Sequence, residues 1–317
     1  MKIRPASIAT DLPDIVRIIS PYEYHPTTVD SLRAQFLHNP PERMIRRLVA
    51  VYKNETVTGY CYISHPVGAP DHHFYVWLGV LPAYRCQGVG AALWNAALEI
   101  LQQQGATRLA SECEDCEPDG LAFAQQRGFS IERHHYPSIL DLTGFDEKPF
   151  LPDIATLEAQ GIRFCSLADF PDTPETQRKF YELNLVVVRD IPGENWDFDK
   201  YPKFYAEFIV GAKWFRPDNQ LLAVDGDNMV GFSSVRLTPE THSAFNATTG
   251  VIREYRGRKI GLVLKVLAAR YARQHGAQQV LTDNDSLNAP ILAINQKLGY
   301  RPQPGNYWLV RWLTENK

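Results

Sequence analysis

The chain has 317 residues, a formal net charge of −3, 44% hydrophobic and 22% charged residues. This length suits two domains of about 150 residues each, and the small negative charge gives no reason to expect a nucleic-acid partner. No apolar run approaches the roughly 20 residues that a membrane span needs, so we also expect no membrane partner. Residues 1–5 are interpreted as a first strand rather than a signal peptide.

The five cysteines argue against a disulfide framework, because their number is odd. They fit a reducing compartment, and we expect a cytoplasmic location. Cys113 and Cys116 form a lone CxxC pattern without two further ligands at suitable spacing. We therefore expect no metal site.

The first half of the chain alternates short apolar runs with helical patterns. Asp11 and Pro13 suit the cap and first turn of a helix, and Gly105 suits the end of another. The expected strands are 2–5, 47–52, 57–64, 73–80, 108–111 and 136–142, and the expected helices begin near 11 and cover 31–38, 90–104 and 120–127.

The second half repeats this order after a segment rich in proline. We expect a first domain at 1–145, a linker at 146–160 and a second domain at 161–317. The expected strands of the second half are 162–166, 220–224, 230–237, 245–251, 279–281 and 307–311, and the expected helices are within 174–188, 200–215, 261–274 and 288–297.

A gapless alignment shows that the two halves are related. Residues 79–129 placed on 250–300 give 14 identities in 51 positions at a constant offset of 171 residues. Shared glycines and a shared arginine at constant offset indicate two copies of one domain. We therefore expect similar folds in both halves, each with a parallel, right-handed crossover around its glycine loop.

The glycine loop of the first copy has the pattern of an anion site. Arg85 to Gly90 lie between a predicted strand and a predicted helix. Free backbone N–H groups and the helix dipole would converge there on a pyrophosphate, with Gly88 and Gly90 allowing close approach. The pattern is neither a Walker loop nor a full dinucleotide fingerprint, and glycines used only for a tight turn remain the alternative.

Residues 80–93 resemble motif A of the GCN5-related N-acetyltransferases (GNAT), which is Arg/Gln-x-x-Gly-x-Gly/Ala after a strand that ends in Val-x-Pro. Residues 123–129, ending in Gly-Phe, resemble the next signature, and 284–300 are similar to the Asn-rich version in tandem enzymes of the mycothiol-synthase type. The resemblance implies an α/β fold of mixed α+β character. Each tandem GNAT-like domain would have a mixed, largely antiparallel sheet, a parallel βαβ crossover and flanking helices.

The resemblance also implies acetyl-CoA as the acyl donor. Its pyrophosphate would lie on the loop and its pantetheine beside the preceding strand. The expected contacts in the first copy are Leu78, Val80, Arg85, Gln87, Gly88, Val89, Gly90 and Ala91. Those in the second copy are Val251, Arg256, Arg258, Lys259, Ile260, Gly261, Asn288 and Asn295.

The catalytic groups are less clear, because both copies depart from the family pattern. The tyrosine that often protonates the leaving thiolate is replaced by Ala124 and by Asn295. Tyr136 and Tyr307 are possible substitutes, with a role as core strand residues as the alternative. Acidic residues end a strand in both copies, Glu112 and Glu114 in the first, Asp283 and Asp285 in the second. We select Glu114, Asp285 and Asn295 as catalytic candidates, against the alternative of solvated acids.

These features predict direct acetyl transfer to a primary amine of a small molecule, by general-base catalysis without a covalent enzyme intermediate. The alternatives are a longer acyl donor, or a CoA-binding regulatory or scaffold protein. Gly88 against Lys259 predicts tighter CoA binding in the first copy, whereas Asn284, Asn288 and Asn295 slightly favour chemistry in the second. A monomer and a homodimer are both compatible with the sequence.

Overall fold

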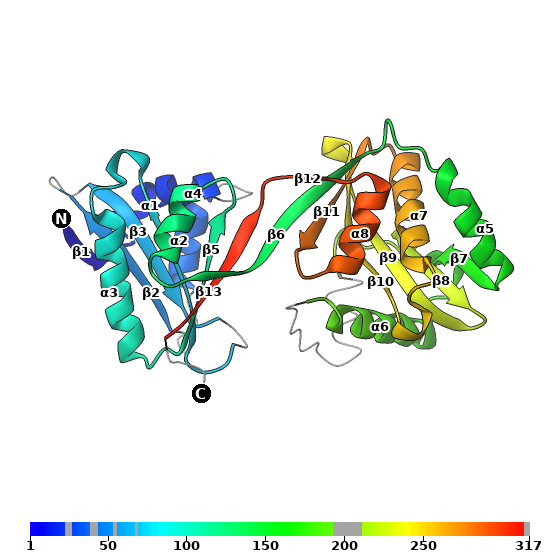
Figure 1. Cartoon of the computed structure of the whole chain (residues 1–317), viewed down its shortest axis with the longest axis horizontal. Helices are drawn as coiled ribbons and strands as arrows, with labels where there is room; N and C mark the ends of the chain where they lie inside the picture. Colours follow the sequence, from blue (N-terminus) through cyan, green and yellow to red (C-terminus); the bar gives the residue numbers. More distant parts are fainter. Residues whose placement is uncertain (23–26, 39–43, 53–55, 67–68, 193–210, 314–317) are drawn as a thin grey trace. The chain divides into compact units, whose positions relative to one another are not determined.

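A computed structural model describes residues 1–22, 27–38, 44–52, 56–66, 69–192 and 211–313 (Figure 1). The chain forms two compact units. The first unit comprises Met1–Arg133 and Asn306–Lys317, and the second comprises His134–Gly305. The two copies of the repeat fall in different units, because 79–129 belong to the first and 250–300 to the second.

The first unit is a mixed sheet with strand order β1-β2-β3-β4-β5-β13. Only β4 and β5 pair in parallel, and the other neighbours are antiparallel. Its strands are β1 (Lys2–Pro5), β2 (Ile45–Val51), β3 (Val57–Ser64), β4 (His73–Val80), β5 (Arg108–Glu114) and β13 (Asn306–Trp312). Its helices are α1 (Leu12–Ile19), α2 (Val29–Leu37), α3 (Val89–Gln103) and α4 (Pro118–Gln125).

Alternating apolar residues place helices on both faces of this sheet, as in Figure 1. Leu48 and Ala50 of β2 share a core cluster with Leu93 of α3. Val49 of the same strand joins Ile15 of α1 in a separate cluster. The sheet is therefore the middle of three layers.

The second unit repeats this plan with strand order β6-β11-β10-β9-β8-β7, and β10 and β11 form its parallel pair. Its strands are β6 (Ser130–Asp141, which enters this unit at His134), β7 (Ile162–Ser166), β8 (Gln220–Asp225), β9 (Asn228–Thr238), β10 (Ser243–Val251), β11 (Gln279–Asp285) and the short β12 (Arg301–Pro302), which pairs with β6. Its helices are α5 (Leu151–Ala159), α6 (Pro174–Arg189), α7 (Ile260–Gln274) and α8 (Ala289–Leu298). The mixed α/β fold predicted for both halves is confirmed.

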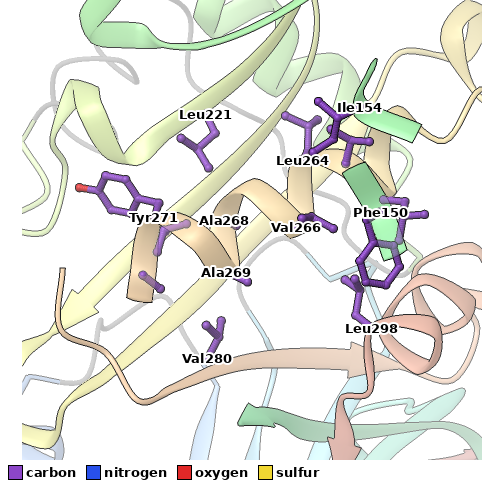
Figure 2. Packing of buried hydrophobic residues seen from close by; sticks show 14 of the residues in the cluster. Phe150, Ile154, Leu221, Leu264, Val266, Ala268, Ala269, Tyr271, Val280 and Leu298 are labelled. Carbon is purple, nitrogen blue, oxygen red and sulfur yellow. The ribbon is translucent and has the colours of Figure 1, made fainter. Parts of the chain in front are cut away.

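The segment expected as a linker is a helix that belongs to the core of the second unit. Ile154 and Leu157 of α5 are buried in one cluster with Leu264 of α7 (Figure 2). Pro152 stands in the first turn of α5, where proline is compatible with a helix. The prolines that suggested a linker therefore help to begin a packed helix.

The closing strand of each half belongs to the unit of the other half. Tyr136 of β6 pairs with Asn284 of β11, and Tyr307 of β13 pairs with Cys113 of β5. Both members of the first pair lie 171 residues from their counterparts in the second pair, so the two ladders have the same register. The compact units therefore divide the chain differently from the contiguous boundaries 1–145 and 161–317.

Two further expectations change in detail. Strands β5 and β11 continue to Glu114 and Asp285, three and four residues beyond the expected ends, so the acidic residues lie within strands. The helix expected over 200–215 lies mostly outside the described residues, and 211–214 form turns.

Candidate active site

The site begins where the two parallel strands of the first unit part. The ladder between β4 and β5 covers His73–Tyr75 opposite Arg108–Ala110 and ends there. Beyond Tyr75, β4 still pairs with β3 on its other side as far as Val80. The β4 edge that faces β5 is therefore available to an extended ligand as an additional strand.

A cavity of about 440 Å³ occupies this region. Its walls come from the end of β4, the loop before α3, the end of β5, helix α4, and Asn306 and Leu309 of β13. Of the residues expected to contact the donor, it is lined by Leu78, Val80, Arg85, Gly88, Gly90 and Ala91, and Glu114 is also in its wall.

Two residues of the loop have left-handed backbone conformations, Cys86 with φ +57° and Gly88 with φ +82°. Gly88 is the residue before α3, and a Cβ built on it would meet no atom within 4 Å. The start of α3 is thus accessible to an anion. Gly90 has another role, because a Cβ there would lie 3.1 Å from the Phe123 ring of α4.

The other two residues of this loop that were expected to contact the donor interact with the protein itself. The side chain of Gln87 donates to the carbonyl of Ala83 at 2.8 Å, and Val89 is buried in the core. Neither residue lines the cavity.

The side chain of Arg85 supports the loop through hydrogen bonds with neighbouring residues. A contact with a phosphate is thus not its only role. Its guanidinium donates to the Val80 carbonyl (3.4 Å), to Glu117 Oε2 (3.2 Å) and to Tyr22 Oη (2.6 Å). Burial and the charges of Glu117 and Glu114 raise the pKa of Tyr22 above its ordinary value, although the nearby Arg85 charge opposes the shift. Arg85 therefore connects the end of β4 to Glu117, which precedes α4, and to Tyr22, which follows α1.

Glu112 is the acidic residue that our selection omitted. It lines the cavity, and its Oε1 accepts a hydrogen bond from Tyr75 Oη at 2.5 Å. Burial, together with the Glu112 charge, raises the pKa of Tyr75 well above its ordinary value, so this phenol remains a donor. The signal for Glu112 was present in the sequence, because it aligns with Asp283. Tyr22 lies outside the aligned residues 79–129, so the repeat gave no signal for it.

Three other residues were singled out from the sequence. Tyr136 and Tyr307 do not line the cavity, whereas Cys113 does. Burial and neighbouring acids raise the pKa of the Cys113 thiol to about 11, which leaves it a neutral wall residue at pH 7. No group of three or more His, Cys, Asp or Glu in the described part of the chain could hold a metal ion.

The loop of the second unit keeps the same backbone. Gly257 and Lys259 have φ +77° and +69°, at the positions of Cys86 and Gly88. Arg256 Nε donates to the Val251 carbonyl at 2.9 Å, as Arg85 does to Val80. Lys259 therefore keeps the left-handed turn, although this conformation is less favourable for lysine than for glycine.

The cations of this second loop are bound to side chains of their own unit. Lys259 Nζ lies 2.6 Å from Asp153 of α5, and Arg258 donates to Gln160 at 3.1 Å. Arg256 pairs with Asp190, which also pairs with Arg253 at 2.5 Å. These hydrogen bonds lower the pKa of Asp190 to about 2.

The other contacts with the donor that were expected in the second copy are packed inside the unit or lie near the start of α8. Ile260 and Val251 are buried, and a Cβ on Gly261 would meet Ile294 at 3.4 Å. Asn288 precedes α8 but makes no side-chain capping bond. Asp285 Oδ1 accepts from the Leu287 N–H at 2.8 Å, and Oδ2 lies 3.4 Å from His135.

Several polar side chains are buried in the interior of the second unit. They come from β10, β11, α7 and α8. Asn295 Nδ2 donates to Asn284 Oδ1 at 2.7 Å, and Lys265 Nζ donates to Asn246 Oδ1 at 2.8 Å. Burial lowers the pKa of Lys265 to about 7. In the first unit the position of Lys265 is held by Trp94, which lines the cavity.

A family model described as the acetyltransferase (GNAT) family matches residues 10–129 and 185–300, more than half of the chain. This chain belongs to the GNAT acetyltransferase family. It is therefore an acetyltransferase, and the tandem GNAT resemblance read from the two loops is confirmed. None of the described helices is long and apolar enough to cross a membrane.

Curated relatives and solved structures agree with the tandem GNAT architecture. The chain is 26% identical over 231 residues to a mycothiol acetyltransferase of Corynebacterium glutamicum, with 70% of each chain covered. It is 30% identical over 239 residues to another from Saccharomonospora viridis, covering 70% of this chain and 69% of that protein. A GNAT structure from Sphaerobacter thermophilus (TM-score 0.65, 16% identity) covers 100% of this chain and 96% of its own, which shows the shared fold. A tandem GNAT protein from the clavulanic acid pathway gives a TM-score of 0.60 at 20% identity, with 100% and 99% covered.

Proposed function

We propose that the first unit carries the acetyl-transfer site and that it acetylates a primary amine of a small molecule with acetyl-CoA. The observation that supports this assignment is the 440 Å³ cavity between β4 and β5, which reaches Gly88 at the accessible start of α3. Both loop arginines are paired with an acid, Arg85 with Glu117 and Arg256 with Asp190, so the difference lies later in the loop: Lys259, paired with Asp153, replaces the open Gly88. We therefore assign the chemistry to the first copy. The sequence alone had slightly favoured the second copy, because of its asparagines.

The residues present suit the parts of the donor. The N–H groups at the start of α3 would bind the pyrophosphate, and the β4 edge beyond Tyr75 would bind the pantetheine as an added strand. Backbone N–H groups of the same edge would then polarise the thioester carbonyl. The apolar walls formed by Trp94, Phe123 and Phe129 would exclude water from the acetyl group.

Glu112, rather than Glu114, is our preferred general base. It receives a proton from the ammonium form of the acceptor, and the neutral nitrogen attacks the thioester carbonyl. The C–N bond forms, the C–S bond breaks, and a second nitrogen proton passes to the leaving sulfur. The products are the acetamide, CoA thiol and one proton released to solvent. Tyr75 fixes one oxygen of Glu112, which orients the carboxylate.

Calorimetry with CoA, combined with thiol release from acetyl-CoA, tests this proposal. We expect one CoA site per chain. Gly88→Asp should raise the Kd at least 30-fold, about 2 kcal/mol, because it adds a negative charge to the anion site. Gly88→Asn is the matched control, since asparagine has a similar shape, no charge and some tolerance of the left-handed conformation. Unchanged CoA binding by Gly88→Asp, or equal losses in both variants, would overturn the assignment.

A further inference from the structure

A second hollow of about 230 Å³ adjoins the donor cavity in the first unit. Tyr22, Trp77 and Glu112 line both, so the two spaces meet at these side chains. An amine seated in the second hollow would therefore reach the proposed base and the end of the donor. Its volume is below the roughly 300–1,000 Å³ of pockets for drug-sized ligands, which indicates a small metabolite.

Aromatic side chains form half of the lining of this hollow. Tyr62 and Trp77 are register partners on β3 and β4, so both side chains share one face of the sheet. The Tyr62 and Tyr75 rings lie 6.3 Å apart, and the Tyr22 and Trp77 rings 5.6 Å apart. Such walls suit a flat, apolar ligand body.

The two charged residues of the hollow come from strands on opposite sides of this aromatic wall. Arg47 is on β2, opposite Tyr62 in register, and Glu112 is on β5. Strands β3 and β4 lie between them and β5 has begun to part from β4 at Glu112, so the two backbones are at least about 14 Å apart at the usual strand spacing. Positive and negative ligand groups would therefore bind at opposite ends of the hollow.

Arg47 is well held for binding an anion. Its guanidinium lies over the Phe36 ring at 4.2 Å and over the Tyr62 ring at 5.4 Å, and it donates to the Gln35 carbonyl at 3.4 Å. A guanidinium fixed in this way loses little entropy on binding, and its planar fork fits a carboxylate.

We propose that the acceptor is a small primary amine with a flat or aromatic body and a carboxylate at the end remote from the amine. The ammonium binds at Glu112, the body lies among Tyr62, Tyr75 and Trp77, and the carboxylate binds Arg47. This inference rests on the proposed function of the first unit and specifies its substrate class. The reaction is the acetyl transfer already described, with no additional reactant.

The test compares 4-(aminomethyl)benzoate with benzylamine, which lacks only the carboxylate, by thiol release from acetyl-CoA. We expect kcat/KM for the acid to be at least tenfold higher in the unaltered protein, because charge-assisted hydrogen bonds of this kind have at least that effect. Phenylalanine, whose carboxylate and amine are adjacent, should be at least tenfold poorer than the acid.

Arg47→Met should remove the preference by lowering kcat/KM for the acid at least tenfold while changing that for benzylamine less than twofold. Arg47→Lys keeps the charge and should retain part of the preference. Arg46→Met is the matched control, because Arg46 is the exposed neighbour on the other face of β2 and does not line the hollow. It should leave both substrates unchanged.

The outcomes separate this inference from the proposed function. If calorimetry detects no CoA binding to the first unit, the proposed function fails and the substrate class with it. If CoA binds but benzylamine is acetylated as well as the acid, or neither amine is acetylated, the substrate class is wrong and the donor site stands. The comparison in the unaltered protein decides the matter even if Arg47→Met does not fold.

Discussion

The two loops of this chain have the same backbone and different surroundings. Each has left-handed residues at the same two positions, with glycine second in the first unit and first in the second unit. Gly88 has open space around its Cβ position, whereas Lys259 is paired with Asp153. The backbone geometry of an anion site is thus present in the second loop although its lysine is paired with an acid of the same unit. Backbone conformation alone therefore does not identify the copy that carries the chemistry.

The interiors of the two units differ as well, at positions that the repeat aligns. The first unit has a cavity walled in part by Trp94 and Phe129, whose rings pack edge to face. Their counterparts in the second unit are Lys265 and Tyr300, with the Lys265 ammonium 4.9 Å from the ring centre. Polar side chains in the second unit thus bind one another where the first unit has space for a ligand.

Replacing the proposed base should give the largest difference between the units. Glu112→Gln removes the proton acceptor, and we expect kcat to fall at least 100-fold in thiol-release assays. Glu114→Gln should cost less than tenfold. Asp283→Asn, at the aligned position of the second unit, should have no effect, and a loss there equal to that of Glu112→Gln would transfer the chemistry to the second unit.

Core substitutions in the exchanged strands should act on the unit of the opposite half. Leu309→Ala in β13 should destabilise the first unit by about 2–5 kcal/mol, because Leu309 is fully buried in its core. Leu140→Ala in β6 should similarly destabilise the second unit. Hydrogen exchange followed by unit measures both effects, and the reverse assignment would contradict the strand exchange.

The buried amine of the second unit predicts a pH effect that the first unit lacks. Lys265, with its pKa lowered to about 7, is neutral when folded but protonated when unfolded between about pH 7 and 10.5. The unfolded state then holds the extra proton, so stability rises with pH across this window by at most about 1.4 kcal/mol per pH unit.

Lys265→Met should remove this dependence and stabilise the protein most at pH 7 and below. Asn246 Oδ1 would keep the hydroxyl of Thr249 as a donor at 3.1 Å. Urea denaturation at pH 7, 8.5 and 10 measures the difference between variant and unaltered protein. A constant difference over this range would mean that Lys265 is protonated in the fold.

The smallest effect concerns the acid that pairs with the second loop. The lowered pKa of Asp190 contributes stability above about pH 3.8 that is lost as the pH falls toward 2. Asp190→Asn should therefore cost less than about 1 kcal/mol at neutral pH, since its arginine partners are largely exposed. Thermal unfolding at pH 7 and pH 2.5 measures this loss, which should shrink at the lower pH.

The Asp153→Asn, Asp190→Asn double variant sharpens the comparison of the two loops. We expect it to keep one CoA site per chain in calorimetry, because Lys265 and the asparagines still fill the interior. A second site in the double variant would show that ion pairing alone closes the second loop.

The periodic elements and the family could be predicted from the sequence, because the apolar alternation and the glycine loop are local signals. The exchange of β6 and β13 could not, since the two closing strands pair with their sheets at equivalent registers and the sequence pattern does not distinguish which sheet each one joins. The helix α5 was missed because proline in a first turn resembles proline in a linker.

The site was predictable only where the motif determines it. Gly88 and Arg85 were found from the loop pattern, whereas their neighbours do not line the cavity: Gln87 is exposed and bonds to the Ala83 carbonyl, and Val89 is buried in the core. The choice between Glu112 and Glu114 depends on which side chain meets Tyr75 and the second hollow. This contact joins neighbouring strands of the sheet whose residues are far apart in the sequence. Tyr22 enters the site from the first helical segment, which carries no family motif.

The exchanged strands also set the order in which the protein can mature during synthesis. Strand β5 ends at Glu114, but β13, the strand that pairs with it, begins only at Asn306. At about 5–20 residues per second, the ribosome needs on the order of 10–40 s to reach it. During that delay the nascent first unit lacks one wall of its cavity, so acetyl-CoA binding should appear only after the second unit has been translated.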